Sequence, residues 1–148
     1  MPDNKFGFGK VLQNIERTKR ELPIQLANQA QNYFTGSFTK QGWDSVHWKE
    51  VKRREPGTPE YKYPKKKGLS RRTSPILVRT GTLRRAVSNS IRSATFQSVR
   101  LIVDLPYAKR HNDGLKDMPQ RKFMGDSPVL RSMQRIKIGS FFNAVWHT

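Results

Sequence analysis

The sequence predicts an α+β fold in which N-terminal helices pack on a small antiparallel β-sheet, with a long basic loop and a C-terminal helix. Three observations support this: an apolar stripe at helical spacing over residues 8–38, two short alternating segments within residues 89–105, and a second helical stripe after Ser127. The order of helices, loop, strands and helix is typical of an α+β protein. A chain of 148 residues suits one domain with a modest core, so we expect a single domain over residues 1–148.

The first expected element is helical and spans residues 8–38. Pro23 interrupts it, so we expect either two helices or one kinked helix, with Pro23 near the first turn of the second part. Apolar residues recur there at steps of three and four. They are Val11, Leu12, Ile15, Leu22, Leu26, Ala30 and Tyr33 or Phe34.

Residues 43–75 have a different composition, with ten basic residues against three glutamates, and four prolines. Little periodicity is present, so we expect a long basic loop or arm. Tyrosines interleaved with cations are suited to phosphates and bases, and equally to a protein interface. The candidate contacts to a neighbouring subunit, a partner protein or DNA are Arg53, Arg54, Tyr61, Tyr63, Lys65, Lys66, Lys67, Arg71 and Arg72.

The chain leaves this loop through the segment ILVRTGTLRRAVSNSI, residues 76–91. Thr80-Gly81 predicts a turn in which Thr80 caps a short helix. Leu83, Ala86 and Val87 then share one helical face, and Leu83, Val87 and Ile91 are expected to be buried against the N-terminal helices. Alternation predicts two antiparallel strands at roughly 89–95 and 99–105.

Two helical segments are predicted in the remainder. The sequence YAKRHNDG predicts one or two helical turns closed by Gly114. Ser127 is a candidate N-cap with Pro128 at the first helical position, and Gly139 is a weak point of the helix that follows. We expect the buried face of that helix to contain Val129, Leu130, Met133, Ile136, Ser140 and Ala144 or Val145.

The composition limits the classes of function that the chain could have. The formal net charge is +18, from 29 Lys and Arg against 11 Asp and Glu, which indicates a polyanion, first of all nucleic acid, or an acidic protein as partner. Leu, Ile, Val and Phe make up 34 of the 148 residues, just above the level at which a highly charged chain is expected to be disordered. There is no cysteine, no apolar window of membrane-spanning length and no signal-peptide core, so we expect a protein made and kept in the cytoplasm or assembled there.

No catalytic pattern is apparent, so we expect no enzyme, no metal and no cofactor. The three histidines are scattered, the carboxylates share no helix face, and no phosphate-binding glycine loop is present. The triplet His111-Asn112-Asp113 is compatible with a metal-dependent nuclease. A helix C-terminus explains Asn112–Gly114 more simply.

A series of short blocks carries a resemblance. In chain order they are Trp48 (or Trp43), Lys65–Gly68, Pro75-Ile76-Leu77, Thr80-Gly81 with Leu83, Ser90-Ile91, Tyr107-Ala108, His111 with Gly114, and Pro119, Arg121, Phe123, Gly125 and Ser127. This arrangement resembles the phage virion morphogenesis family, which comprises tail completion or neck proteins of Mu-like phages and related prophages.

The resemblance implies a structural, non-enzymatic virion protein that acts in head–tail joining or tail completion, assembled in the bacterial host cytoplasm. It implies a homo-oligomeric ring, hexameric or dodecameric, that contacts other neck, portal-adaptor or tail proteins, with genomic DNA passing through and no membrane. The charge leaves a small basic nucleic-acid-binding protein as the alternative. The motif residues expected to be structural are Thr80, Gly81, Leu83, Ile91, Tyr107, His111, Gly114, Phe123 and Gly125.

Overall fold

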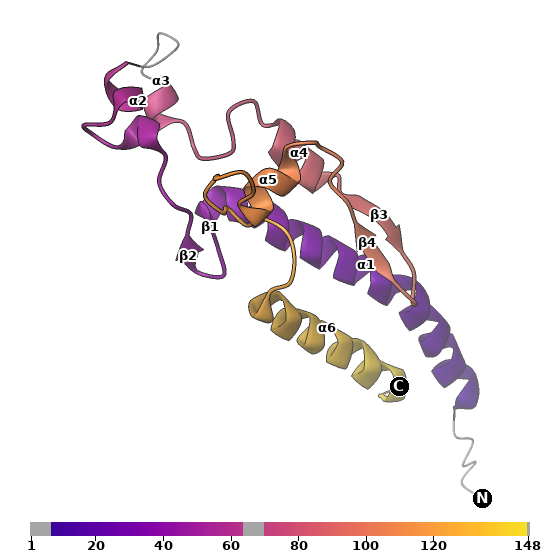
Figure 1. Ribbon diagram of the computed structural model, residues 1–148. Helices are drawn as coiled ribbons and strands as arrows, with labels where there is room; N and C mark the ends of the chain where they lie inside the picture. Colours follow the sequence, from indigo (N-terminus) through magenta and orange to yellow (C-terminus); the bar gives the residue numbers. More distant parts are fainter. Residues whose placement is uncertain (1–6, 64–69, 148) are drawn as a thin grey trace, which may run out of the picture. The chain divides into compact units, whose positions relative to one another are not determined.

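The computed structural model describes residues 7–63 and 70–147, and its α+β architecture confirms the predicted fold class (Figure 1). Within these described residues there are two antiparallel two-stranded sheets, β1–β2 and β3–β4. The elements in order are α1 (Phe8–Lys40), β1 (Gly42–Trp43), β2 (Val46–His47), the 3-10 helix η1 (Lys52–Arg54), α2 (Pro59–Lys62), α3 (Ser70–Thr73), α4 (Thr82–Ser88), β3 (Ile91–Ala94), β4 (Val99–Leu101), α5 (Ala108–Asp113) and α6 (Pro128–Trp146).

The chain divides into two compact units. Unit 1 comprises residues 1–31, 91–102 and 126–148, and unit 2 comprises residues 32–90 and 103–125. Helix α1 supplies residues to both units, whereas β3, β4 and α6 belong to unit 1 and the other elements to unit 2. The expectation of one domain over the whole chain stays a prediction.

Helix α1 is one helix of 33 residues with Pro23 inside it. The alternative of two separate helices is therefore wrong. A proline removes one hydrogen bond of the helix ladder, but a long buried stripe supports the helix on both sides of Pro23. Leu12 was expected in that stripe and is 61% exposed. The buried apolar residues of α1 are Val11, Leu22, Ala27, Ala30, Phe34 and Phe38.

The predicted β-hairpin of unit 1 is confirmed, with shorter strands than expected. β3 pairs with β4 in the register Ala94 with Val99 and Ile91 with Leu101, and an irregularity lies between Ile91 and Ser93. Thr95 and Ser98 close the turn through reciprocal backbone hydrogen bonds of 2.9 and 3.1 Å. The side chain of Ile91 is half-buried.

The turn before α4 differs from the prediction in its cap. Gly81, with φ of 71°, is the N-cap residue, and its carbonyl accepts from the Arg85 N–H at 2.9 Å. Thr80 lies one residue before this cap, and its hydroxyl is 2.9 Å from the hydroxyl of Thr82. A left-handed cap favours glycine, so the cap falls on Gly81. Leu83 and Val87 are buried, as the sequence predicts.

The boundaries of α5 and α6 agree with the sequence. Gly114 closes α5 in the left-handed conformation, and the Ser127 hydroxyl accepts from the Leu130 N–H at 3.1 Å with Pro128 in the first turn of α6. The predicted face of α6 is partly wrong, because Leu130 and Val145 are buried but Ile136 is 75% exposed. The helix carries two apolar stripes, and periodicity does not say which one packs. Gly139 lies inside α6 and does not end it.

Candidate functional site

The basic segment of unit 2 contains more regular structure than the predicted long loop. Residues 43–75 include strands β1 and β2 at the beginning, then η1, α2 and α3. The Thr58 hydroxyl accepts from the Tyr61 N–H at 3.3 Å, and Pro59 follows at the first helical position of α2, which is a favourable helix start. We call the described residues of η1, α2 and α3 with their connections, 49–63 and 70–75, the basic lobe.

Two arginines of η1 hold the basic lobe together. Arg54 donates from Nε to the Arg72 carbonyl at 3.0 Å and from Nη2 to the Ser74 carbonyl at 2.6 Å. Arg53 donates to the same Ser74 carbonyl at 3.1 Å. Arg54 also pairs with Glu50 at 3.4 Å. The guanidinium groups thus satisfy carbonyls that these short helices leave without intrahelical partners.

Arg72 joins α3 to α2. Its Nη2 donates to the Tyr61 carbonyl at 2.6 Å, and its guanidinium lies over the Tyr61 ring, 4.2 Å from the ring centroid. This is the geometry of a cation–π interaction. Arg53, Arg54, Tyr61 and Arg72, all predicted as partner contacts, therefore have roles inside the chain, and their role in partner contact stays a prediction.

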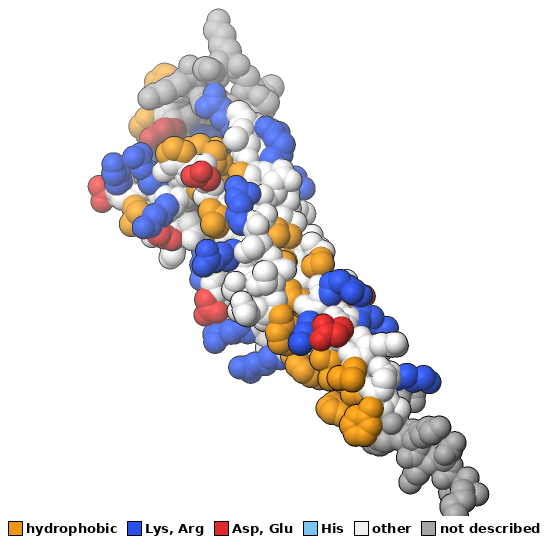
Figure 2. Space-filling view, turned by 90° about the vertical axis from the view of Figure 1, so that its right-hand side faces the viewer, with side chains coloured by type: hydrophobic (Ala, Val, Ile, Leu, Met, Phe, Trp, Pro, Cys, Tyr) orange, Lys and Arg blue, Asp and Glu red, His pale blue; other side chains and the backbone are white. Residues whose placement is uncertain are grey.

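Other cations of the basic lobe face solvent. Lys49, Lys52 and Lys62 are exposed, and Tyr63 beside them is 79% exposed. In the space-filling view, Lys and Arg side chains occur along most of the visible face (Figure 2). Of the predicted contacts, Lys65, Lys66, Lys67 and the side chain of Arg71 lie outside the described residues.

Two residues of the sequence blocks, Trp48 and Phe123, form an aromatic cluster with Phe38 elsewhere in unit 2. The Phe38 ring meets Trp48 edge-on at 5.7 Å between centroids and lies 5.4 Å from Phe123. The indole Nε1 of Trp48 donates to the Lys122 carbonyl at 2.8 Å. All three side chains are buried, so Trp48 and Phe123 form part of the core of unit 2.

Arg121 lies beside the aromatic cluster and is 7% exposed. Its Nε and Nη2 donate to the Lys49 carbonyl at 3.1 and 3.0 Å, and Nη2 also reaches the Glu50 carbonyl at 3.3 Å. Burial lowers the pKa of Arg121, and the Glu50 carboxylate acts in the opposite direction. This buried cation is therefore bound to backbone oxygens and is not presented to a ligand.

His111 lies on α5 and is linked to Arg121 through the backbone. The His111 carbonyl accepts from the Arg121 N–H at 2.8 Å. The His111 ring meets the half-exposed Tyr107 ring edge-on, with 6.2 Å between the ring centroids. Burial lowers the pKa of His111, and the Arg121 charge lowers it further. Nδ1 of His111 is buried without a hydrogen-bond partner in the described part of the chain.

Asn112 is a structural residue that the sequence did not single out for this role. Its Oδ1 accepts from the N–H groups of Phe123 and Met124, both at 3.0 Å, and so fixes the segment after Gln120 against α5. At Gly114, φ is 69°, and a Cβ there would lie 2.9 Å from the Gln120 nitrogen. The block from Tyr107 to Gly125 thus packs on itself. Gly125 lies at its exposed end.

Gln41 makes a second side-chain link that the sequence patterns do not predict. The side chain of Gln41 accepts from the Ile76 N–H at 2.5 Å and donates to the Ile76 carbonyl at 3.2 Å. It thereby holds the Pro75-Ile76-Leu77 block to the end of α1. An amide side chain that pairs with one residue's N–H and C=O across 35 positions leaves no local sequence signal.

Among the residues the structure describes, no group of three or more His, Asp or Glu side chains could hold a metal ion. Within the same residues, no helix is both long and apolar enough to cross a membrane. Comparisons with models of known families, with characterised proteins and with solved structures found no match to this chain.

Proposed function

We propose that this chain is a structural virion protein of a tailed bacteriophage, acting in head–tail joining or tail completion as a ring at the neck or the upper end of the tail. The observation that carries the proposal is the ordered series of blocks from Trp48 to Ser127, which resembles the phage virion morphogenesis family. Several residues of these blocks have structural roles in unit 2, as expected of a structural protein. Trp48 and Arg121 donate hydrogen bonds to backbone carbonyls, and the Phe123 side chain is buried in the core.

On this proposal the protein is not an enzyme, and its place is the virion, after assembly in the cytoplasm of a bacterial host. Its partners are further copies of itself, other neck, portal-adaptor or tail proteins, and the genomic DNA that passes through the ring. Closing a ring requires two different surfaces of each copy to meet. The exposed side of the basic lobe is one such surface, because the side chains of Lys49, Lys52, Lys62 and Tyr63 face solvent there.

The test is the solution mass of the full chain by multi-angle light scattering, after nuclease treatment and at moderate salt. A discrete oligomer of the mass of six or twelve copies is expected for a preformed ring. A Lys52→Glu and Lys62→Glu double variant is expected to shift that mass toward the monomer, whereas a Lys109→Glu and Arg110→Glu double variant, at two exposed cations on α5, serves as the charge-matched control. A monomer at every concentration and salt would contradict a self-assembling ring.

The exposed lysines and Tyr63 of the basic lobe also favour a second candidate, a small basic protein that binds nucleic acid without sequence preference. Cations can neutralise phosphates while an exposed aromatic ring stacks on a base. This candidate predicts a stable monomer whose DNA affinity falls steeply with salt. The same mass measurement, repeated with added single- and double-stranded DNA, separates the two candidates.

A further inference from the structure

Exposed apolar side chains are concentrated in unit 1. Among the described residues, most of the large apolar side chains that face solvent belong to this unit rather than to unit 2. Figure 2 shows hydrophobic side chains gathered toward the lower end of the view. In unit 1 they are Phe8, Leu12, Ile24, Phe96, Ile102, Val129, Met133, Ile136, Phe142 and Trp146.

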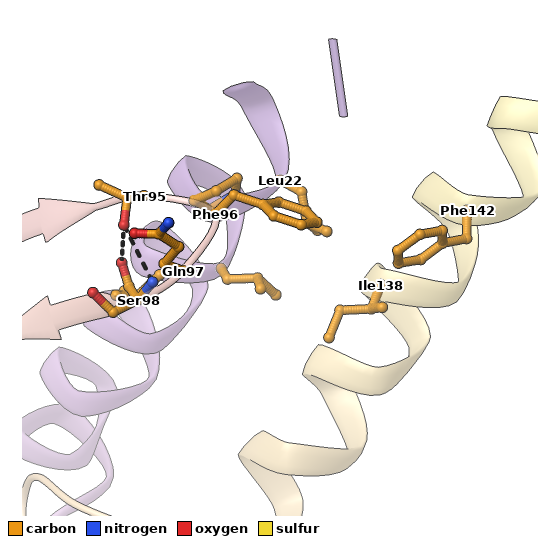
Figure 3. Close-up of a pocket in the computed structure, with 10 residues that line it drawn as sticks. Leu22, Thr95, Phe96, Gln97, Ser98, Ile138 and Phe142 are labelled. Carbon is orange, nitrogen blue, oxygen red and sulfur yellow. Dashed lines mark hydrogen bonds between the residues drawn. The ribbon is translucent and has the colours of Figure 1, made fainter. Parts of the chain in front are cut away.

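Some of these side chains border a groove of about 330 Å³ that lies wholly within unit 1. Its walls are α1 at Leu22, Pro23 and Leu26, the turn of the β3–β4 hairpin, and α6 at Ile138 and Phe142. Figure 3 shows Leu22 and Phe96 on one side of the space, with Ile138 and Phe142 extending toward it from α6. Phe96 and Phe142 are 53% and 47% exposed, so both rings have surface left to bury.

The groove has no charged side chain in its described lining. None of the described residues that border it is Lys, Arg, Asp, Glu or His. Thr95 and Ser98 are engaged with one another, since the Thr95 hydroxyl donates to the Ser98 carbonyl at 3.1 Å and accepts from the Ser98 N–H at 3.2 Å. The groove therefore suits aliphatic or aromatic side chains, which are driven into it by the hydrophobic effect.

The surroundings of the groove are positively charged. The described residues of unit 1 contain nine Lys and Arg against Glu16, Glu21 and Asp126. Glu16 and Asp126 are already paired, with Lys19 and Arg131, both at 3.1 Å. Helix α6 has no acidic residue. At this groove, an acidic segment of another protein is a better electrostatic match than a second copy of this basic chain, whereas the contacts between copies in the proposed ring use other surfaces.

Helix α6 places a cation in line with the groove. Arg135, Ile138, Phe142 and Trp146 follow one another at steps of three and four residues, so they share one face of the helix. Arg135 is exposed and Trp146 is 64% exposed. An incoming segment that inserts apolar side chains beside Phe142 thus passes a guanidinium at one end of the face and an indole at the other.

We propose that the groove between α1, the β3–β4 turn and α6 docks a segment of another protein that combines large apolar side chains with flanking Asp or Glu residues. The apolar side chains fill the groove, and the carboxylates pair with Arg135 and the surrounding cations. This is the mode in which an amphipathic segment lies in an apolar groove, with charge selecting the partner. The inference uses only unit 1 and does not rest on the proposed virion role.

The test is fluorescence anisotropy of the full chain with three labelled synthetic peptides of equal length. The first carries Leu and Phe at helical spacing with Glu between them, the second replaces Glu by Lys, and the third keeps Glu but replaces Leu and Phe by Ser. We expect the first to bind at least about tenfold more tightly than either of the others. The third peptide controls for nonspecific attraction of any acidic peptide to a chain of charge +18.

Variants locate the binding. Phe142→Ser and Phe96→Ser are expected to weaken the first peptide about tenfold, whereas Ile136→Ser, on α6 but outside the groove, leaves it unchanged. Arg135→Glu should weaken it and flatten its salt dependence, with Arg84→Glu on α4 as the charge-matched control. Circular dichroism checks that each variant is folded. The proposal would be overturned if the first and third peptides bound with equal affinity, or if Phe142→Ser and the wild type bound the first peptide equally well. Self-association of the chain that Phe142→Ser abolishes would also overturn it, because the groove would then hold a second copy.

Discussion

The indole N–H of Trp48 donates to the backbone carbonyl of Lys122 at 2.8 Å, linking two segments 74 positions apart in the sequence. Trp48 directly precedes the basic lobe, and Lys122 lies in the segment that follows α5. The bond thus joins the first and last of the sequence blocks of unit 2, next to the rings of Phe38 and Phe123. We interpret it as the central tie of unit 2.

Replacing Trp48 by Phe tests this tie. The variant keeps an aromatic ring but leaves the Lys122 carbonyl without its donor, and an unsatisfied buried acceptor costs about 1–3 kcal/mol. We expect a loss of that size in the free energy of unfolding, measured by urea denaturation. Tyr63→Phe, at a side chain that is 79% exposed, should change it by less than about 0.5 kcal/mol. A Trp48→Phe variant as stable as wild type would contradict the role of the bond.

Arg121→Lys tests whether the buried guanidinium is a structural brace. Lysine keeps the charge but cannot reproduce the forked contact of Nε and Nη2 with the Lys49 carbonyl. Hydrogen bonds from a charged donor contribute about 1.5–3 kcal/mol, so we expect a loss of stability in that range. Arg110→Lys, at an exposed position on α5, should be neutral within about 0.5 kcal/mol. Equal effects of the two substitutions would argue that Arg121 acts only through its charge.

Gly114 and Gly36 form a matched pair of glycines for alanine substitution. At Gly114 the backbone is left-handed and a Cβ would lie 2.9 Å from the Gln120 nitrogen, so Gly114→Ala should cost more than about 1 kcal/mol. Gly36 lies inside α1 with no atom within 4 Å of an added Cβ. Gly36→Ala should therefore raise stability by about 0.5–1 kcal/mol. Thermal unfolding of both variants measures the contrast, and a neutral Gly114→Ala would show that the turn relaxes.

The buried His111 predicts a pH dependence of stability. Burial and the Arg121 charge hold its pKa in the folded protein below the ordinary value of 6.5. The unfolded chain therefore binds a proton at a higher pH than the folded chain does, and stability is lost as the pH falls below about 6.5. Urea unfolding between pH 8 and pH 5 measures this loss. His111→Gln should remove part of the pH dependence in that window, and an unchanged slope would show that other groups cause it.

Local sequence signals predicted several features of the fold. The cap Ser127-Pro128, the helix end at Gly114 and the alternation of β3 and β4 depend on near neighbours, and each is confirmed. What failed depends on distant partners. Periodicity did not show that α6 buries Leu130 and Val145 while Ile136 stays exposed, because these residues lie in neighbouring apolar stripes and only the rest of unit 1 selects between them.

The candidate site was less predictable. Composition identified the arginines of the basic lobe but not their structural role. Arg54 and Arg72 donate to backbone carbonyls that come within reach only when η1, α2 and α3 have folded together. The roles of Asn112 and Gln41 were missed for the same reason. A polar side chain that forms a hydrogen bond with a backbone group distant in the sequence produces no periodicity and no recognisable motif.

Electron microscopy of the nuclease-treated full chain is the sharpest test of the proposed ring, because it shows assembly and symmetry together. We expect closed particles of sixfold or twelvefold symmetry with a central opening, formed by the protein itself or on addition of purified phage neck and tail components. Particles without cyclic symmetry, or a monomer that ignores those components and binds DNA with affinity that collapses as salt rises, would contradict it.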